Sequence, residues 1–131
     1  MAASEPLRFG YDGYKRMNQI ERTTVVDKLT AWQSGAIDAK AIWEWSLTAV
    51  ETGTPADAAV ADVMDVLVAL PQDLIIVDDA GVMLEALANP IEELTESQNL
   101  VWNYFDFIDT EGRKQMLADD AFYGEFCGAA F

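Results

Sequence analysis

The chain has 131 residues, 51% of them apolar, which is enough for one domain around a buried core. It has 23 acidic and 8 basic residues, a formal net charge of -15 and no histidine. This charge disfavours direct binding of nucleic acid, because a phosphate backbone needs Lys and Arg to neutralise it. No apolar run reaches transmembrane length, so we expect no membrane partner.

The acidic residues are unevenly spread along the sequence. Residues 1–34 hold five basic and four acidic side chains, whereas the span 41–112 holds fifteen Asp and Glu and neither Lys nor Arg. The same span is rich in Val, Leu, Ile, Met and Trp, so it is expected to fold rather than to form a disordered acidic tail. We therefore expect a folded surface with its negative charge concentrated on one face.

Residues 1–13 contain Pro6, Gly10 and Gly13 and are predicted to be an irregular N-terminal arm. This arm lacks the apolar stretch of a signal peptide. The one cysteine, Cys127, cannot form an internal disulfide. A cytoplasmic location is therefore expected.

A first helix is predicted from about Tyr14 to Gln33, with Gly35 as its C-terminal stop. Its buried face recurs at helical spacing in Val25, Leu29 and Trp32. Asp38 is suited to cap a second helix, which ends at Gly53. The apolar face of this second helix is predicted to hold Trp43, Leu47 and Val50.

Thr54-Pro55 is typical of a helix start, a capping residue followed by proline at the first helical position. The third helix then runs to Pro71 and is predicted to bury Val60, Val63, Met64, Leu67 and Leu70. Residues 74–77 (LIIV) fit either a short strand or a buried helical turn. A lone strand has no evident partner, so a helix or an extended connector is favoured.

Asp78 or Asp79 is expected to cap a fourth helix that ends at Leu87, and Asn89-Pro90 begins a long fifth helix. The fifth helix has an apolar stripe comprising Ile91, Leu94, Gln98, Val101, Phe105 and Ile108. Opposite lies a polar stripe of Glu92, Glu96, Asn99, Asn103 and Asp106. A third, apolar stripe comprises Leu100, Tyr104 and Phe107.

Two apolar stripes on one helix have two explanations. Either the helix lies centrally in the bundle, or one stripe meets a partner, and the central position is favoured because aromatic residues at helical spacing are usually core. A last helical stretch is predicted from Asp109 to Leu117, and an aromatic C-terminal segment is expected to fold back onto the bundle. Residues 1–131 are therefore predicted to form a single all-α domain, a compact bundle of five or six helices.

The residue types exclude most catalytic sites. Without histidine and with one cysteine, neither Ser-His-Asp or Cys-His catalysis nor the usual zinc and iron–sulfur sites can be built. The neighbours of Cys127 include an acid and no close base, which favours a buried structural cysteine. A calcium loop centred on Gly112 would need a carboxylate where Ala118 stands. The acidic pairs Asp78-Asp79, Glu92-Glu93 and Asp119-Asp120 are better explained as helix-start residues, so we expect no enzyme and no cofactor.

The segment LTAWQSGAIDAKAIWEWS (29–46) resembles the opening of several small helical immunity-like families of bacterial toxin systems. In these families a helix ends in Trp-x-x-Gly, an isoleucine follows, and a Trp-containing helix comes next. The matching residues here are Trp32, Gly35, Ile37 and Trp43. The resemblance covers under a fifth of the chain. It implies a small acidic helical protein that occupies a basic toxin or nuclease domain, and it assigns no individual site residue.

The acidic surface is expected to bind a basic protein, with carboxylates that steer docking and exposed aromatic side chains that anchor it. The predicted contact residues are Asp78, Asp79, Glu92, Glu93, Glu96, Tyr104, Asp106, Asp109 and Glu111. Three alternatives stay open. The chain can be a phage-type DNA mimic or anti-defence inhibitor, its third apolar stripe can join two copies in a homodimer or an oligomeric adaptor, or its acidity can serve solubility alone.

Overall fold

The computed structural model describes residues 19–127, so the predicted arm at residues 1–13 lies outside the described part of the chain. The all-α prediction is confirmed within these residues, which form six α-helices, three short 3-10 helices and two strands of two residues each. The elements in chain order are β1 (Gln19–Ile20), α2 (Arg22–Ser34), α3 (Ala39–Thr52), β2 (Thr54–Pro55), α4 (Ala58–Val68), η1 (Val77–Asp79), α5 (Ala80–Ala88), η2 (Ile91–Glu93), α6 (Leu94–Asp106), α7 (Thr110–Leu117) and η3 (Tyr123–Phe126).

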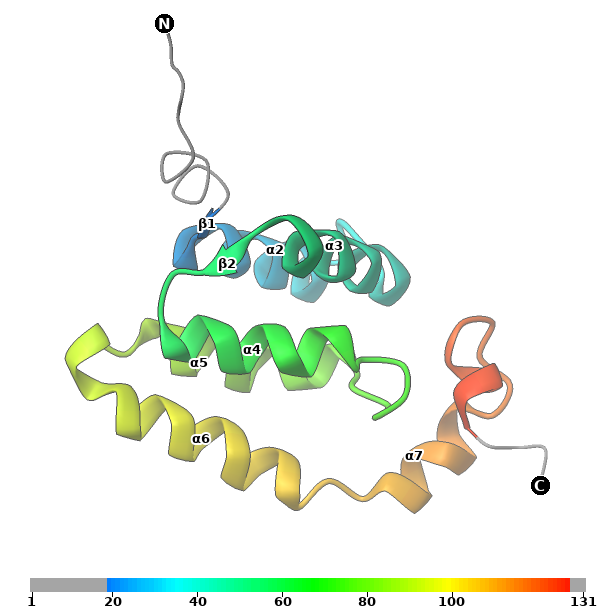
Figure 1. The fold of residues 1–131 in the computed structure, drawn as a ribbon. Helices are drawn as coiled ribbons and strands as arrows, with labels where there is room; N and C mark the ends of the chain where they lie inside the picture. Colours follow the sequence, from blue (N-terminus) through cyan, green and yellow to red (C-terminus); the bar gives the residue numbers. More distant parts are fainter. Residues whose placement is uncertain (1–18, 128–131) are drawn as a thin grey trace, which may run out of the picture.

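The helices lie in three layers (Figure 1). α2 and α3 form the first layer, α4 and α5 the middle layer, and α6 the third, with α7 continuing beyond its end. α2 packs on α5 and α3 on α4, while α6 packs on both helices of the middle layer. The middle layer is thus covered on both sides, and α6 is an outer helix.

The buried apolar side chains form one connected cluster around the middle layer. The predicted buried faces of the first and third helices are confirmed, namely Val25, Leu29, Trp32, Val60, Val63, Met64, Leu67 and Leu70. Each such aliphatic side chain contributes roughly 1.5–3 kcal/mol on burial. The cluster is therefore the main source of the stability of the bundle.

Several predicted helix ends are confirmed by their backbone and side-chain geometry. Gly35 ends α2 with a φ of 86°, a left-handed conformation that costs glycine little. Asp38 caps α3, since its carboxylate accepts a hydrogen bond from the Ala41 N–H at 2.9 Å, and Gly53 ends that helix. Asp109 caps α7 in the same way, at 3.0 Å from the Gly112 nitrogen.

The predicted starts of the first and third helices are wrong, and α6 begins at Leu94, after η2, rather than directly at Asn89-Pro90. The helix predicted from about Tyr14 begins only at Arg22, because Gln19 and Ile20 are extended and pair in parallel with Thr54 and Pro55. The same pairing removes Thr54-Pro55 from the helix that follows. The cap of α4 is instead Asp57, whose carboxylate accepts a hydrogen bond from the Val60 N–H at 3.0 Å.

The predicted apolar face of the second helix is also wrong in part. Leu47 and Val50 are exposed, and the buried residues of α3 are Ile42 and Ser46. The face that packs on α4 thus lies one residue earlier than the apolar pattern indicates. A serine is tolerated there because its hydroxyl donates a hydrogen bond to the Trp43 carbonyl at 2.6 Å.

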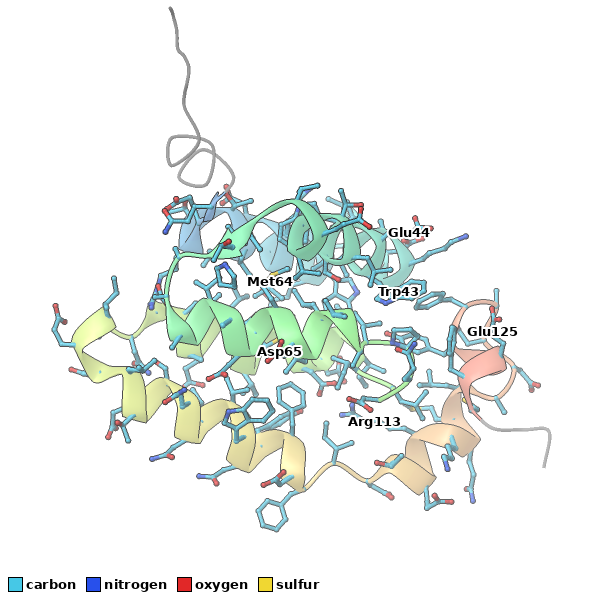
Figure 2. The ribbon with its side chains drawn as sticks, in the orientation of Figure 1. Trp43, Glu44, Met64, Asp65, Arg113 and Glu125 are labelled. Atoms are coloured by element: carbon cyan, nitrogen blue, oxygen red, sulfur yellow. The ribbon has the colours of Figure 1, made fainter. Side chains whose placement is uncertain are left out.

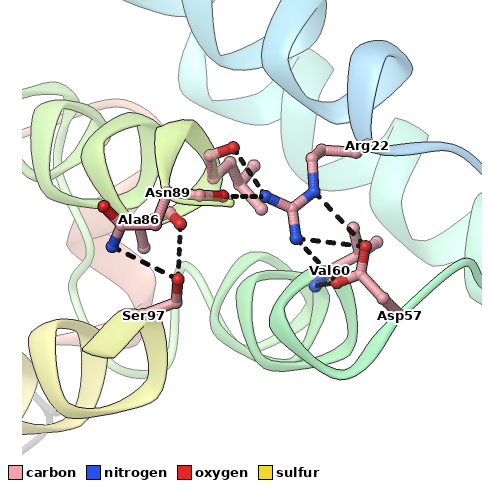
Figure 3. A network of polar contacts seen from close by, with 7 residues as sticks. Arg22, Asp57, Val60, Ala86, Asn89 and Ser97 are labelled. Atoms are coloured by element: carbon pink, nitrogen blue, oxygen red, sulfur yellow. Dashed lines mark hydrogen bonds and ion pairs between the residues drawn. The ribbon is translucent and has the colours of Figure 1, made fainter. Parts of the chain in front are cut away.

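One arginine ties the first layer to the middle layer (Figure 3). The Arg22 guanidinium donates to both oxygens of the Asp57 carboxylate and, at 2.8 Å each, to the backbone carbonyls of Leu87 and Asn89. It therefore joins the starts of α2 and α4 to the end of α5. A serine hydroxyl on α6, that of Ser97, donates to the Ala86 carbonyl and extends these polar contacts to the third layer.

The predicted return of the aromatic C-terminal segment is confirmed as far as the structure describes it. Phe122 and Phe126 pack against Trp43, with ring centroids 5.6 Å and 6.1 Å from its ring. The Trp43 indole in turn donates to the Val68 carbonyl at 2.9 Å. Cys127 is buried, as predicted. The segment after α7 therefore closes the end of the α3–α4 pair.

Candidate functional site

A groove with a cavity volume of about 990 Å³ lies between α6 and α7. α6 contributes Glu96, Asn99, Leu100, Asn103, Tyr104 and the following Phe107. The connector and α7 contribute Ile108, Asp109, Gly112, Arg113 and Met116. The two outward stripes of the fifth helix, one polar and one apolar, thus form one wall of a single groove.

This groove corrects the prediction of a central fifth helix. Most of the first apolar stripe turns to the core, where Val101 is buried and Leu94 and Phe105 are half-buried, but Ile91 at its start is wrong because it lies on η2 and is 63% exposed. The third stripe lines the groove instead. Its end is fully open, since Phe107 is 86% exposed, and Met116 on the opposite wall is 61% exposed. Neighbouring exposed apolar side chains of this size are typical of interaction surfaces.

A buried carboxylate supports the base of the groove. Asp79 is 0% exposed, and its oxygens accept hydrogen bonds from the Tyr104 hydroxyl at 2.6 Å and from the Ile76 N–H at 2.8 Å. The Arg113 guanidinium donates to both of its oxygens, at 2.6 Å and 2.9 Å. Four donors thus surround one buried charge, which is the condition under which a buried ion pair is tolerated.

Arg113 also binds the backbone of the turn before η1. Its guanidinium donates to the Leu74 carbonyl at 3.0 Å, and Leu74 is held at a φ of 55°, a region that a leucine rarely adopts. Figure 2 shows Arg113 between this turn and α7. These contacts join α7, and with it one wall of the groove, to the turn before η1.

The ionisation of the groove side chains follows from the same contacts. The hydrogen bond to Asp79 raises the pKa of the Tyr104 phenol above its ordinary 10.0, and burial adds to the effect. The hydrogen bond to Asp79 likewise raises the pKa of Arg113. Both groups therefore stay protonated at neutral pH. With its lone pairs occupied by four donors, Asp79 is not placed to act as a general base.

The nine predicted contact residues lie in three kinds of position: in the lining of the groove, exposed elsewhere, or buried. Glu96, Tyr104 and Asp109 line the groove. Five others are exposed but do not line the groove: Glu92 and Glu93 on η2, Asp106 on α6, Glu111 on α7 and Asp78 on η1. The prediction that Asp79 contacts a partner is wrong, because its side chain is buried and is not available to a partner. Asp79 is the N-cap residue of α5, as predicted, but its side chain makes no capping hydrogen bond there.

The prediction of one acidic face is wrong. Each of the helices α2 to α7 carries at least one exposed carboxylate, including Asp27 on α2, Glu44 on α3 and Glu85 on α5. Ion pairs within residues 19–127 number three: Arg22–Asp57, Arg113–Asp79 and Lys114–Glu111. Exposed carboxylates therefore lie on both outer layers of the bundle, and the apolar groove rather than the charge marks a particular place on the surface.

Sequence reasoning missed Arg113 and Met116 because the wall that they form has no periodic signal of its own. It placed Asn99 and Asn103 in the polar stripe but gave them no role in the site. The sequence signal that could have indicated this wall is Arg113 itself, because it is the first basic residue after a long acidic span. A carboxylate buried in that span would need such a cationic partner.

The chain matches no family of known proteins, no curated protein and no solved structure. The residues that resemble the immunity-like pattern occupy structural positions, with Trp32 buried, Gly35 at the end of α2 and Trp43 under the C-terminal aromatic rings. Within residues 19–127, no three His, Cys, Asp or Glu side chains are grouped to hold a metal ion. No helix in this range combines the length and the apolar character needed to cross a bilayer.

Proposed function

We propose that this chain is a non-catalytic binding protein that neutralises a basic protein by docking it on the groove between α6 and α7. The observation that carries the proposal is the combination of exposed apolar side chains in this groove with carboxylates on both of its walls. The apolar surface supplies contact energy, while the surrounding charge speeds association and selects a basic partner.

The favoured hypothesis is that the chain is an immunity protein that covers a bacterial toxin such as a nuclease domain. The resemblance of residues 29–46 supports it, and so does the net charge of -15. The groove also favours it over a DNA mimic. A mimic needs a regular row of carboxylates in place of phosphates, and the row on α6 is interrupted by Asn99 and Asn103. A mimic therefore depends on charge alone, whereas a groove binder also depends on Leu100 and Phe107.

The first experiment measures association with the partner by rapid mixing. The triple variant Glu92→Gln, Glu93→Gln and Glu96→Gln removes three charges beside the groove. Its association rate is expected to fall about tenfold at low salt while its unfolding free energy changes little, because exposed charges steer encounter and add little to folding.

A matched control removes the same number of charges from the opposite layer of the bundle. Asp27→Asn, Glu44→Gln and Glu51→Gln lie on α2 and α3, and all three residues are exposed. This control is expected to slow association by a much smaller factor. Equal slowing by the two triple variants would show that net charge, and not the groove, selects the partner, and this result would favour a DNA mimic or general electrostatic attraction.

The identity of the partner is tested genetically. A gene for a toxin with a basic C-terminal domain is expected beside the gene for this chain. Expression of that domain should arrest growth of a host cell, and co-expression of this chain should restore it. Restoration should be lost with Leu100→Asp or Phe107→Asp. Full rescue by both variants would contradict docking on the groove.

Self-association through the groove is tested separately, by sedimentation. A homodimer through the groove would place its acidic walls against each other, which like charge opposes. Sedimentation at physiological salt is therefore expected to give a monomer. A dimer that Phe107→Asp dissociates would instead support the oligomeric alternative.

A further inference from the structure

A second cavity, of about 380 Å³, lies on the other side of α6. It is formed by the end of α4, the turn before η1, and α6 with its following connector. Trp102 and Phe105 provide an aromatic wall, and Ile108, which also lines the α6–α7 groove, joins the two cavities. Trp102 is 41% exposed, a large uncovered area for this residue type.

Two carboxylates belong to the same cavity. Asp65 lies on α4, which runs above α6 in Figure 2, and Asp73 lies in the turn before η1. Neither has an ion-pair partner among residues 19–127, and no Lys or Arg lines the cavity. The cavity therefore places two carboxylates without an ion-pair partner in this range next to an aromatic surface.

This combination fits a particular chemical group. The planar guanidinium of arginine stacks on aromatic faces and donates hydrogen bonds to carboxylates through its fixed fork. The methylene stem of the same side chain packs on apolar atoms, which Val66 and Ile108 provide here. A lysine ammonium is more strongly hydrated and stacks less well, and an apolar side chain would leave the carboxylates without a partner.

We propose that this cavity, defined by Asp65, Asp73, Trp102 and Phe105, binds the guanidinium of an arginine side chain presented by the basic partner. The inference rests on the proposed function, since the partner supplies the arginine, and it gives the partner one definite feature. An arginine must project beside the segment that fills the α6–α7 groove, because the two cavities adjoin at Ile108.

The test uses the full chain and small probes. Nα-acetyl-arginine methylamide is titrated into ¹⁵N-labelled protein, with the citrulline analogue as a neutral probe of the same shape and the lysine analogue as a second cation. The arginine probe is expected to shift the Trp102 indole N–H signal and the backbone amide of Asp73 in a saturable way. The lysine probe should bind more weakly, and the citrulline probe should leave these signals unchanged. The Trp102 signal is assigned by its loss in Trp102→Phe.

Two double variants separate this cavity from general charge. Asp65→Asn with Asp73→Asn is expected to weaken binding of the arginine probe about tenfold, equivalent to about 1.4 kcal/mol. Glu44→Gln with Glu51→Gln removes the same charge from α3 and should leave binding unchanged. All four residues are exposed, so both proteins should fold, which their amide spectra will show.

Three results would overturn the inference: equal shifts with citrulline, binding by lysine as strong as by arginine, or equal weakening in the two double variants. These results are distinct from a failure of the proposed function. If the cavity binds the arginine probe but no basic protein docks on the groove, the function fails alone. If a toxin binds and Asp65→Asn with Asp73→Asn has no effect on it, the arginine inference fails alone.

Discussion

Arg113 is the residue on which the shape of the groove most directly depends. Its guanidinium is the cationic partner of the buried Asp79 carboxylate and also holds the Leu74 carbonyl. Arg113→Ala would leave an uncompensated charge in the protein interior, so we expect a loss of about 3–5 kcal/mol in unfolding free energy. Urea denaturation at pH 7 measures this loss.

The neighbouring residue provides a control for this prediction. Lys114 pairs with Glu111 at 3.2 Å on the exposed side of the same helix. Lys114→Ala is expected to cost about 0–1 kcal/mol, the usual range for an exposed pair. The double variant Asp79→Asn with Arg113→Met should be more stable than Arg113→Ala, because it removes both charges. Similar losses for Arg113→Ala and Lys114→Ala would contradict the structure of this buried pair.

Tyr104 is expected to make the unfolding free energy depend on pH in the alkaline range. Its pKa is raised in the folded state, mainly by the hydrogen bond to Asp79, so folding favours the protonated phenol. The contribution is complete below the unfolded value of about 10 and is lost as pH rises through the higher folded pKa. Unfolding free energy is expected to fall more steeply from pH 9 to about pH 11 in the wild type than in Tyr104→Phe. Parallel curves would show that the phenol titrates alike in both states.

Tyr123 should show the same behaviour independently. Burial, followed by the nearby charges of Asp120 and Asp79, raises the pKa of its phenol, and its hydroxyl donates to the Ile75 carbonyl. Absorbance at 295 nm therefore should show two tyrosines whose pKa lies above the ordinary value of 10.0, with the larger shift at Tyr123. The variants Tyr104→Phe and Tyr123→Phe assign each step. Ionisation of all four tyrosines near pH 10 would contradict both environments.

At the scale of elements, the two aspartate caps differ in what they support. Asp38 caps α3 and has no other described contact, whereas Asp57 caps α4 and also binds the Arg22 guanidinium. Asp38→Ala is expected to cost about 1 kcal/mol, and Asp57→Ala about twice as much. Asp57→Ser keeps a capping oxygen but loses the ion pair, so it should lie between them. If Asp38→Ala and Asp57→Ala lower the unfolding free energy equally, as measured by thermal or urea unfolding, the contact of Asp57 with Arg22 adds no stability.

Helix ends were predictable where one residue carries the signal. Gly35 needs only its own backbone freedom, and Asp38 needs only the free N–H groups three residues later. The start of α2 was not predictable in this way, because it depends on a pairing between residues 19–20 and 54–55 that no local pattern announces. For residues 74–77 a helix or an extended connector was favoured over a strand, and the structure has no strand there: Leu74 ends a turn at a φ of 55°, Ile75 and Ile76 have no regular structure, and η1 begins at Val77.

The role of α6 shows a second limit of sequence reasoning. Helical spacing separates the three stripes, but spacing cannot show which stripe has a neighbour, and Ile91 of the first stripe is exposed on η2. The structure places the third stripe in a groove because the chain turns after Asp106 and α7 packs elsewhere, through Arg113, instead of covering it. The site was therefore predictable as a surface of α6 that includes Tyr104 and Glu96. Its second wall required the tertiary contact.

At the scale of the whole molecule, the net charge of -15 should give opposite salt effects on folding and on binding. Added salt screens repulsion among exposed carboxylates, so the melting temperature of the free protein should rise between about 10 mM and 300 mM NaCl. Association with a basic partner should slow over the same range. Calorimetry and rapid-mixing kinetics measure the two effects. A flat association rate would contradict electrostatic steering, and a constant melting temperature would mean that self-repulsion is negligible.

The contact between Asp79 and Arg113 joins positions 34 residues apart, and it has a consequence for protein synthesis. A nascent chain that has emerged from the ribosome only through α6 already displays Leu100 and Phe107, but the opposite side of the groove is not yet built. Until α7 emerges, the Asp79 carboxylate also lacks its cation, so the last packing step is delayed. The groove between α6 and α7 is therefore completed only after α7 has been synthesised and Arg113 has paired with Asp79.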